Sequence, residues 1–173
     1  MLKKIQQDSH DQFEELGYPS KKLENWKFSS SKHLKKYKSD SSHNKDLSID
    51  QYKDQYTLCF INGKLSEESL NDFAYKDDIS ISDIETLNDN SLCVTSSHFK
   101  KEAFFHLGLS TVKTGKYFEF KKGVNFDNPI EIVNLYDKNS KDLRISSFNI
   151  FKINTGNNIS IIEKDINQGV DSF

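Results

Sequence analysis

The sequence predicts an α+β, largely helical N-terminal region over residues 1–95, followed over residues 96–173 by the first coils of a right-handed parallel β-helix. The first forty residues carry short helical patterns, whereas strand patterns recur beyond Gly115 with centres about 13 to 15 residues apart. That spacing exceeds the roughly 8–12 residues typical of a sandwich or small barrel. Short strands and turns that recur with a fixed period are typical of solenoids. An antiparallel meander with long loops is the alternative that spacing leaves open.

The N-terminal region begins with a predicted helix over residues 8–16. Phe13 and Leu16 lie three positions apart on one face, Gly17 occupies the position after the helix, and Pro19 prevents its continuation. Two further helical turns are predicted around the apolar residues Leu23, Trp26 and Phe28 and then Leu34 and Tyr37. The polar stretch 39–46 is predicted to be a loop.

Strands follow from residue 56. The run 56–61 leads directly into Asn62-Gly63, the strongest short hairpin signal, and then into a brief return strand at Lys64-Leu65. The other predicted elements are strands at 79–84, 92–95, 117–121, 130–135, 143–153 (one long strand or a bent pair) and 159–162, and a helix at 97–105. We expect the Asn and Gly residues of the later turns to relieve positive-φ strain at the coil corners.

Composition excludes several classes of function. The formal charge is −2, which gives no overall basic footprint for nucleic acid. No apolar run approaches the roughly 18 residues of a membrane span, and no apolar stretch follows the N-terminal lysines as in a secretory signal. Arg144 is the only arginine, which disfavours a site that grips phosphates or carboxylates through a guanidinium fork. Two cysteines suit a reducing cytosol, so we expect a cytoplasmic protein that has neither nucleic acid nor membrane as a partner.

No residue pattern predicts catalysis, and the predicted catalytic, cofactor and metal sites are therefore none. Cys93, His98 and His106 are the nearest approach to a metal set, but Cys93 lies between Leu92 and Val94 and is expected to be a small buried hydrophobe, with the two histidines at the surface. Cys59 receives the same interpretation. The lysine run at 32, 35, 36 and 38 is interpreted as a hydrated helix face, and the adjacent acids at 14–15, 67–68 and 77–78 as solvated turns.

Several stretches, taken in order, resemble the SufD family, the scaffold subunits of the SUF iron–sulfur cluster assembly machinery. The first is LGYPSKKLENWKF at 16–28, and the second is LCFINGKL at 58–65. The third runs from 104 to 132, and the fourth from 154 to 164. Within the third, the matching residues are Leu107, Leu109, Gly115, Phe118, Phe120, Lys122, Gly123, Val124, Pro129, Ile130 and Ile132.

The resemblance implies a cytosolic, non-enzymatic scaffold that pairs with a SufB-like homologous subunit through its β-helix. It also implies that a SufC-like ATPase is recruited through a C-terminal helical region, and that iron–sulfur clusters are assembled on the whole complex. No cofactor is expected on this chain itself.

Two departures from the family pattern bear on those expectations. The chain stops within the β-helix by analogy, so the ATPase-binding region and the late cysteine and histidine positions have no counterpart, and a truncated stack is expected to be marginally stable or to self-associate. Gly108 stands where the family has Asn.

A second function class stays open from the residues, namely a β-solenoid or β-sandwich that binds a ligand near Tyr117 and Phe118. The sequence leaves the roles of Cys59 and Cys93 open. For Trp26, packing with Leu23 and Phe28 is the favoured interpretation over partner contact.

Overall fold

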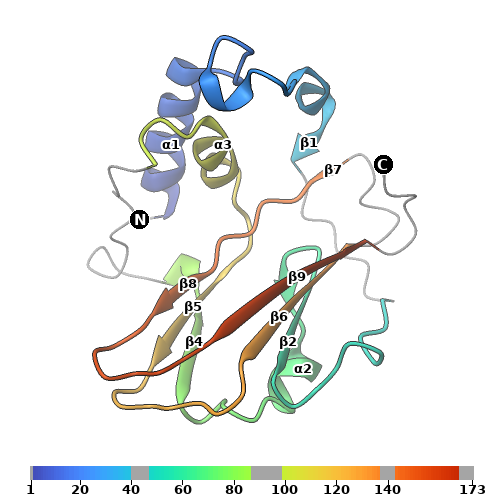
Figure 1. Cartoon of the computed structure of the whole chain (residues 1–173), viewed down its shortest axis with the longest axis vertical. Helices are drawn as coiled ribbons and strands as arrows, with labels where there is room; N and C mark the ends of the chain where they lie inside the picture. Colours follow the sequence, from blue (N-terminus) through green and yellow to red (C-terminus); the bar gives the residue numbers. More distant parts are fainter. Residues whose placement is uncertain (1, 40–46, 87–98, 137–142, 168–173) are drawn as a thin grey trace.

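The computed structural model describes residues 2–39, 47–86, 99–136 and 143–167. Figure 1 shows helices α1 (Leu2–Leu16) and α3 (Ala103–Ser110) at one end of the molecule, and two groups of strands with the short helix α2 (Glu67–Asn71) at the other. The fold is mixed α/β, and each of the two larger sheets contains both parallel and antiparallel pairs. The predicted boundary at 95/96, residues 40–46 of the predicted loop 39–46 and the predicted strand at 92–95 lie outside the described residues. Ser39, the first residue of that predicted loop, instead ends a short strand.

The helical end is built on helix α1 (Leu2–Leu16), which packs against helix α3 (Ala103–Ser110). Phe13 of α1 contacts Ala103 and Leu107 of α3 in one buried cluster. The prediction for the end of α1 is confirmed, because Gly17 has φ 65° and its N–H donates to the Phe13 carbonyl at 2.7 Å. The helix begins at least six residues earlier than predicted.

Of the remaining helical predictions, one is confirmed and one is wrong. The two helical turns predicted after α1 are present as short 3-10 helices, η1 (Glu24–Trp26) and η2 (Lys32–Lys36). The helix predicted at 97–105 instead spans Ala103–Ser110, preceded by a turn in which the Glu102 N–H donates to the Phe99 carbonyl. Packing of its apolar face on α1 sets where this helix lies, and local sequence preference does not carry that information.

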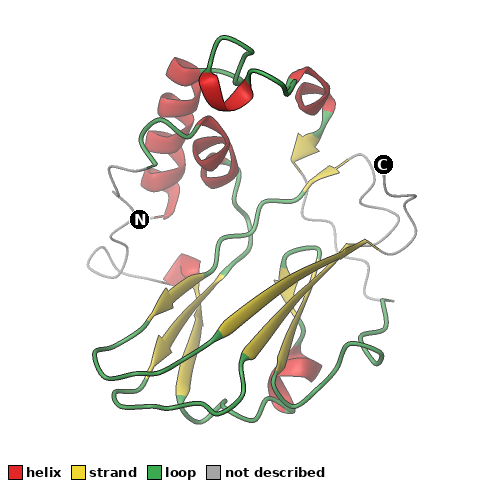
Figure 2. Ribbon diagram, viewed as in Figure 1, coloured by secondary structure: helices red, strands yellow, loops and turns green. Residues whose placement is uncertain are grey.

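The first sheet has the strand order β3-β2-β6-β9 and is drawn on the right in Figure 2. Its strands are β2 (Thr57–Ile61), β3 (Lys64–Leu65), β6 (Ile130–Tyr136) and β9 (Ile161–Asn167). The predicted hairpin between β2 and β3 is confirmed, since Asn62 and Gly63 both have positive φ, 47° and 83°. Short helix α2 (Glu67–Asn71) follows and packs on β2.

The second sheet has the order β4-β5-β8, formed by β4 (Ile79–Asp83), β5 (Lys116–Phe120) and β8 (Ile150–Lys152). A 3-10 turn, η3 (Ile84–Thr86), ends β4. Strands β1 (Lys38–Ser39) and β7 (Leu143–Arg144) form a separate parallel pair. The strand predicted at 143–153 is therefore the bent pair β7 and β8.

Beyond residue 116 the chain makes two successive passes, and we call each pass a coil. The first coil contains β5 and β6, and the second contains β8 and β9, which pair in parallel with β5 and β6 respectively. Glu119 of β5 faces Lys152 of β8, 33 residues later, and Asn134 of β6 faces Asp165 of β9, 31 residues later. These parallel pairs contradict an antiparallel meander, in which adjacent strands would alternate in direction.

The main core lies between the two larger sheets. Leu58 and Phe60 of β2 meet Phe118 and Phe120 of β5 there, and all four are at most 1% exposed. The ring of Phe118 stacks on Phe151 in the next coil with centroids 4.7 Å apart. Because burying one such side chain contributes about 1.5–3 kcal/mol, aromatic residues compensate for the low apolar fraction of the chain.

Candidate functional site

The outward faces of the stacked strands carry ion pairs between neighbouring strands. Lys152 on β8 contacts Glu119 on β5, and Lys164 on β9 contacts Glu131 on β6 at 2.7 Å. The Glu119 carboxylate raises the pKa of Lys152, chiefly by accepting its hydrogen bond. Exposed ion pairs of this kind add little stability, so their main effect is to favour one register between the neighbouring strands.

Asparagine side chains join the coils at their corners. Asn158 Nδ2 donates to Asn125 Oδ1 at 2.8 Å, and Asn157 Oδ1 accepts from the Val124 N–H at 3.2 Å. Asn154 Nδ2 donates to the Phe120 carbonyl at 2.6 Å. This corrects the predicted role of the asparagines. Among the described residues only Asn62 is a non-glycine residue with positive φ, so the corner asparagines act through side-chain hydrogen bonds and leave positive φ to glycines.

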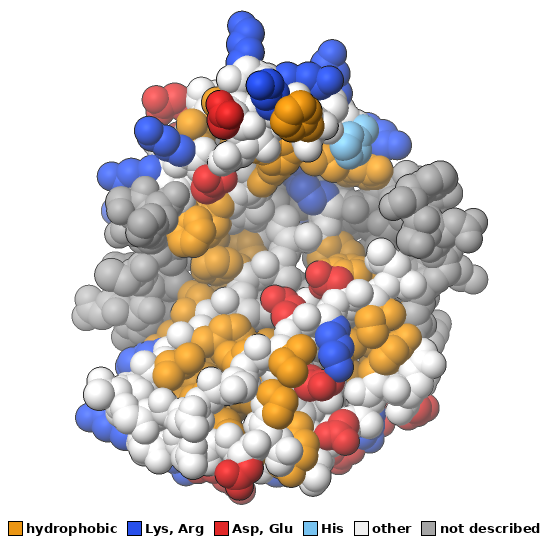
Figure 3. Space-filling model, in the orientation of Figure 1, with side chains coloured by type: hydrophobic (Ala, Val, Ile, Leu, Met, Phe, Trp, Pro, Cys, Tyr) orange, Lys and Arg blue, Asp and Glu red, His pale blue; other side chains and the backbone are white. Residues whose placement is uncertain are grey.

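Strands β8 and β9 stand last in their sheets and form an edge that we call the open edge. Among the described residues, each pairs with a strand on one side only. Figure 3 shows hydrophobic side chains gathered over this part of the molecule. Ile153 and Ile162 are 51% and 42% exposed, and Phe151 and Ile161 are only partly buried. An apolar strand edge of this kind pairs readily with a further strand.

A cleft of about 430 Å³ lies between the two sheets at the open edge. Glu163 and Asp165 line it, and the Asn134 amide donates to both carboxylates at 2.8 and 3.0 Å. Burial, reinforced by Asp165, raises the pKa of Tyr136 to about 12. Among the described residues, no group of three or more His, Cys, Asp or Glu side chains is arranged to hold a metal ion.

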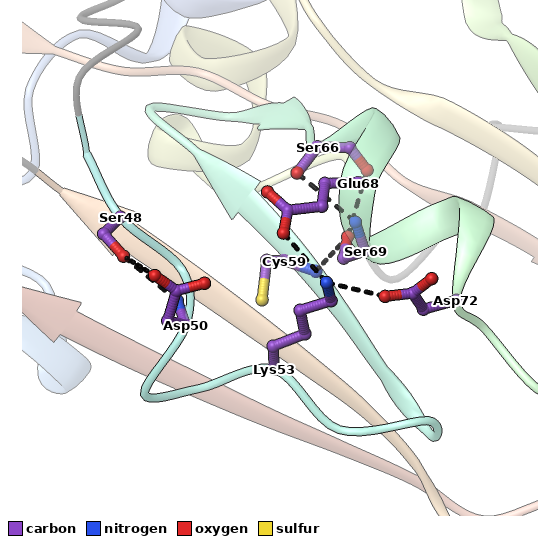
Figure 4. Close-up of polar contacts among 8 residues, drawn as sticks. All are labelled: Ser48, Asp50, Lys53, Cys59, Ser66, Glu68, Ser69 and Asp72. Atoms are coloured by element: carbon purple, nitrogen blue, oxygen red, sulfur yellow. Dashed lines mark hydrogen bonds and ion pairs between the residues drawn. The ribbon is translucent and has the colours of Figure 1, made fainter.

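Cys59 lies on the face of β2 opposite to Leu58 and Phe60, outside the main core, and is drawn in Figure 4. Its side chain is fully buried, its N–H donates to Ser69 Oγ at 3.0 Å, and burial raises its pKa to about 11. The prediction of a small buried hydrophobe is confirmed for this residue as far as burial is concerned. Nearby, Lys53 Nζ bridges Glu68 at 2.8 Å and Asp72 at 2.6 Å, and both carboxylates raise its pKa.

The other candidate metal ligands are not brought together by any described contact. Cys93 and His98 lie outside the described residues. His106 is 9% exposed on α3, and neither of its ring nitrogens has a hydrogen-bond partner. It packs edge-on against Phe105, so the prediction of a surface histidine is wrong for this residue.

The N-terminal motif residues divide into two groups. Trp26 packs against Phe104 of α3 with ring centroids 5.0 Å apart, so the packing interpretation is confirmed. Its expected neighbours are wrong, however, because Leu23 and Phe28 are 54% and 93% exposed. The lysines of η2 at 32, 35 and 36 are exposed, as predicted for a hydrated face.

The alternative ligand site near Tyr117 and Phe118 gains no support from their positions. Tyr117 is 6% exposed and Phe118 is 1% exposed, so both rings belong to the core.

Two further findings concern known proteins and membrane-spanning helices. No family model matches this chain, and no match was found among the curated proteins. No described helix combines the length and apolar character needed to cross a bilayer.

Proposed function

We propose that this chain is a non-enzymatic scaffold subunit of the SufD kind, whose second half winds as a right-handed parallel β-helix with two strands per coil. The observation that carries the proposal is the pair of parallel alignments β5–β8 and β6–β9, in which two successive passes of the chain stack on each other. The hydrogen bonds between Asn125 and Asn158 and the stacked Phe118 and Phe151 support the same coil register.

The proposed scaffold acts by binding partner subunits at its surface. At its open edge, β8 and β9 each pair with a strand on one side only among the described residues, and the side chains of Ile153 and Ile162 are exposed. On this proposal a SufB-like subunit pairs there, a SufC-like ATPase acts in the same cytoplasmic complex, and the iron–sulfur cluster is assembled by that complex with no cofactor resident on this chain. The raised pKa of the buried Cys59 supports a packing role for the one cysteine whose surroundings are described.

Co-purification tests the proposal. The tagged chain is expressed with a SufB-type subunit, alone and with a SufC-type ATPase, and retention of the SufB-type subunit is measured. Ile162→Lys, at the open edge, should reduce retention at least tenfold. Leu16→Lys at the end of α1 is the matched control, because the two side chains are similarly exposed (42% and 40%), and it should leave retention unchanged. No retention of the SufB-type subunit by the unmodified chain would refute the assignment.

A further inference from the structure

A strongly basic surface covers the segment between α1 and β1. Over residues 20–37 six lysines are exposed and one glutamate is the only acidic residue. The formal charge of this segment is therefore +5 in a chain whose total is −2, so the remainder of the chain carries −7. The lysines are Lys21, Lys22, Lys27, Lys32, Lys35 and Lys36. We call this segment the basic surface.

Two apolar side chains stand out of the basic surface on either side of η1. Phe28 is 93% exposed and Leu23 is 54% exposed, although Trp26 between them packs on Phe104. Lys27 Nζ lies 5.7 Å from the centre of the Phe28 ring. Figure 3 shows the same arrangement at the helical end, where blue side chains surround an exposed hydrophobic group.

Contacts with the helical end of the molecule hold the segment that carries Leu23 and Phe28 in place. The buried Ser31 hydroxyl donates to the Pro19 carbonyl at 2.7 Å. Tyr18 packs edge-on against Phe13 and Phe104, and Lys35 Nζ lies 5.1 Å above its ring. Leu23 and Phe28 are therefore exposed on a turn that hydrogen bonds and ring packing hold in place.

We propose that the basic surface binds the anionic headgroups of a lipid bilayer, with Phe28 and Leu23 inserting at the interface. Clusters of four to eight lysines are attracted to anionic leaflets, and apolar side chains beside them enter the boundary between headgroups and acyl chains. All the basic side chains of this segment that carry a full charge are lysines. This fits a bilayer, because attraction to many headgroup phosphates at once does not require the bidentate fork of arginine.

Two other anionic partners fit less well. A single strand of nucleic acid stacks successive bases on several aromatic faces. Here Phe28 is the one fully exposed Phe, Tyr or Trp ring of the segment, while Trp26 and Tyr18 pack on Phe104. Tyr37 is half-buried with Lys36 Nζ 5.0 Å over its ring, and Leu23 has no π system. Protein interfaces are depleted in lysine, whereas lysine makes up six of the eighteen residues of this segment. A protein can bind the surface of a bilayer without a spanning helix. The lack of a long apolar run in the sequence therefore excludes a membrane span and leaves surface binding open.

Vesicle co-sedimentation of the full chain tests the proposal. Vesicles of phosphatidylcholine with 30% phosphatidylglycerol should bind the chain, and pure phosphatidylcholine vesicles should not. Binding should fall steeply between 0.1 and 0.5 M NaCl, because the Debye length shortens. Lys21→Glu with Lys22→Glu should weaken binding at least about 25-fold, at about fivefold for each lysine lost. Phe28→Ser should weaken binding at fixed charge.

The matched control is Lys100→Glu with Lys101→Glu, which makes the same change of net charge at two exposed lysines outside the basic surface. It should retain binding to within about threefold. Equal weakening by both pairs would overturn the proposal, as would equal binding to neutral vesicles. Tighter binding to a labelled single-stranded RNA than to the anionic vesicles, lost in Phe28→Ser, would assign the surface to nucleic acid instead.

Discussion

Gly115 is the residue at which substitution tests coil stacking most sharply. It lies just before β5, with φ +156°, where L side chains are strained. A Cβ atom added there would lie 2.0 Å from the Phe148 carbonyl oxygen and 2.8 Å from its carbon. Phe148 belongs to the following coil, and its N–H donates to the Thr114 carbonyl at 3.1 Å. Gly115→Ala therefore forces two backbones apart.

The expected cost follows from two terms. A residue held in such a backbone conformation costs about 1–3 kcal/mol. Displacing a packed neighbour costs about 1–3 kcal/mol more, because the clash is with backbone and no rotamer change relieves it. Together these terms reach about 2–6 kcal/mol, a large share of the roughly 5–15 kcal/mol that stabilises a typical domain.

Two glycines serve as controls in urea unfolding followed by circular dichroism. Gly123 has φ +73° but open space around it, so Gly123→Ala should cost only about 1–2 kcal/mol. Gly108 lies in α3 with nothing within 4 Å, so Gly108→Ala should stabilise by roughly 0.5–1 kcal/mol. A Gly115→Ala variant no less stable than Gly123→Ala would refute the close contact between the two coils.

Three further predictions concern the buried groups and the open edge. Stability should fall as pH rises from about 9 to 12, because the folded pKa of Cys59 (about 11) and that of Tyr136 (about 12) exceed their ordinary values of 9.0 and 10.0. Both groups therefore lose their protons at lower pH in the unfolded chain than in the folded one. Tyr136→Phe should flatten the dependence above pH 10, and an unchanged profile would contradict this prediction. Trp26→Ala should destabilise by about 1–3 kcal/mol, measured by thermal unfolding, and a neutral result would assign this ring to partner contact. The isolated chain should self-associate in sedimentation velocity, and Ile153→Lys with Ile162→Lys should shift it toward monomer; a monomeric unmodified chain would count against the open edge as a pairing surface.

Local signals in the sequence predicted the elements that depend on local physics. Gly17 ends α1 and Asn62-Gly63 makes the hairpin because both need backbone conformations that few residues adopt. The alternation of Phe118 and Phe120 gave the buried face of β5 correctly. In each case a few neighbouring residues determine the outcome.

Features that depend on distant contacts were predicted less well. Helix α3 was placed too early, because its position depends on packing of Ala103 and Leu107 on Phe13, far away in sequence. Parallel pairing between coils was left open by strand spacing, since period alone does not give strand direction. The exposure of Phe28 was missed for the same reason, because Trp26 packs on Phe104 and Phe28 remains 93% exposed.

Cross-linking between coils tests the central claim most directly. Glu119 and Lys152 are register partners on β5 and β8, and Glu131 and Ile162 are partners on β6 and β9. With Cys93 replaced by Ser, Glu119→Cys with Lys152→Cys, and separately Glu131→Cys with Ile162→Cys, should each form a rapid link within one chain. The mismatched pair Glu119→Cys with Lys164→Cys should link slowly. Rapid linking of the mismatched pair, with neither matched pair reacting, would contradict parallel stacked coils.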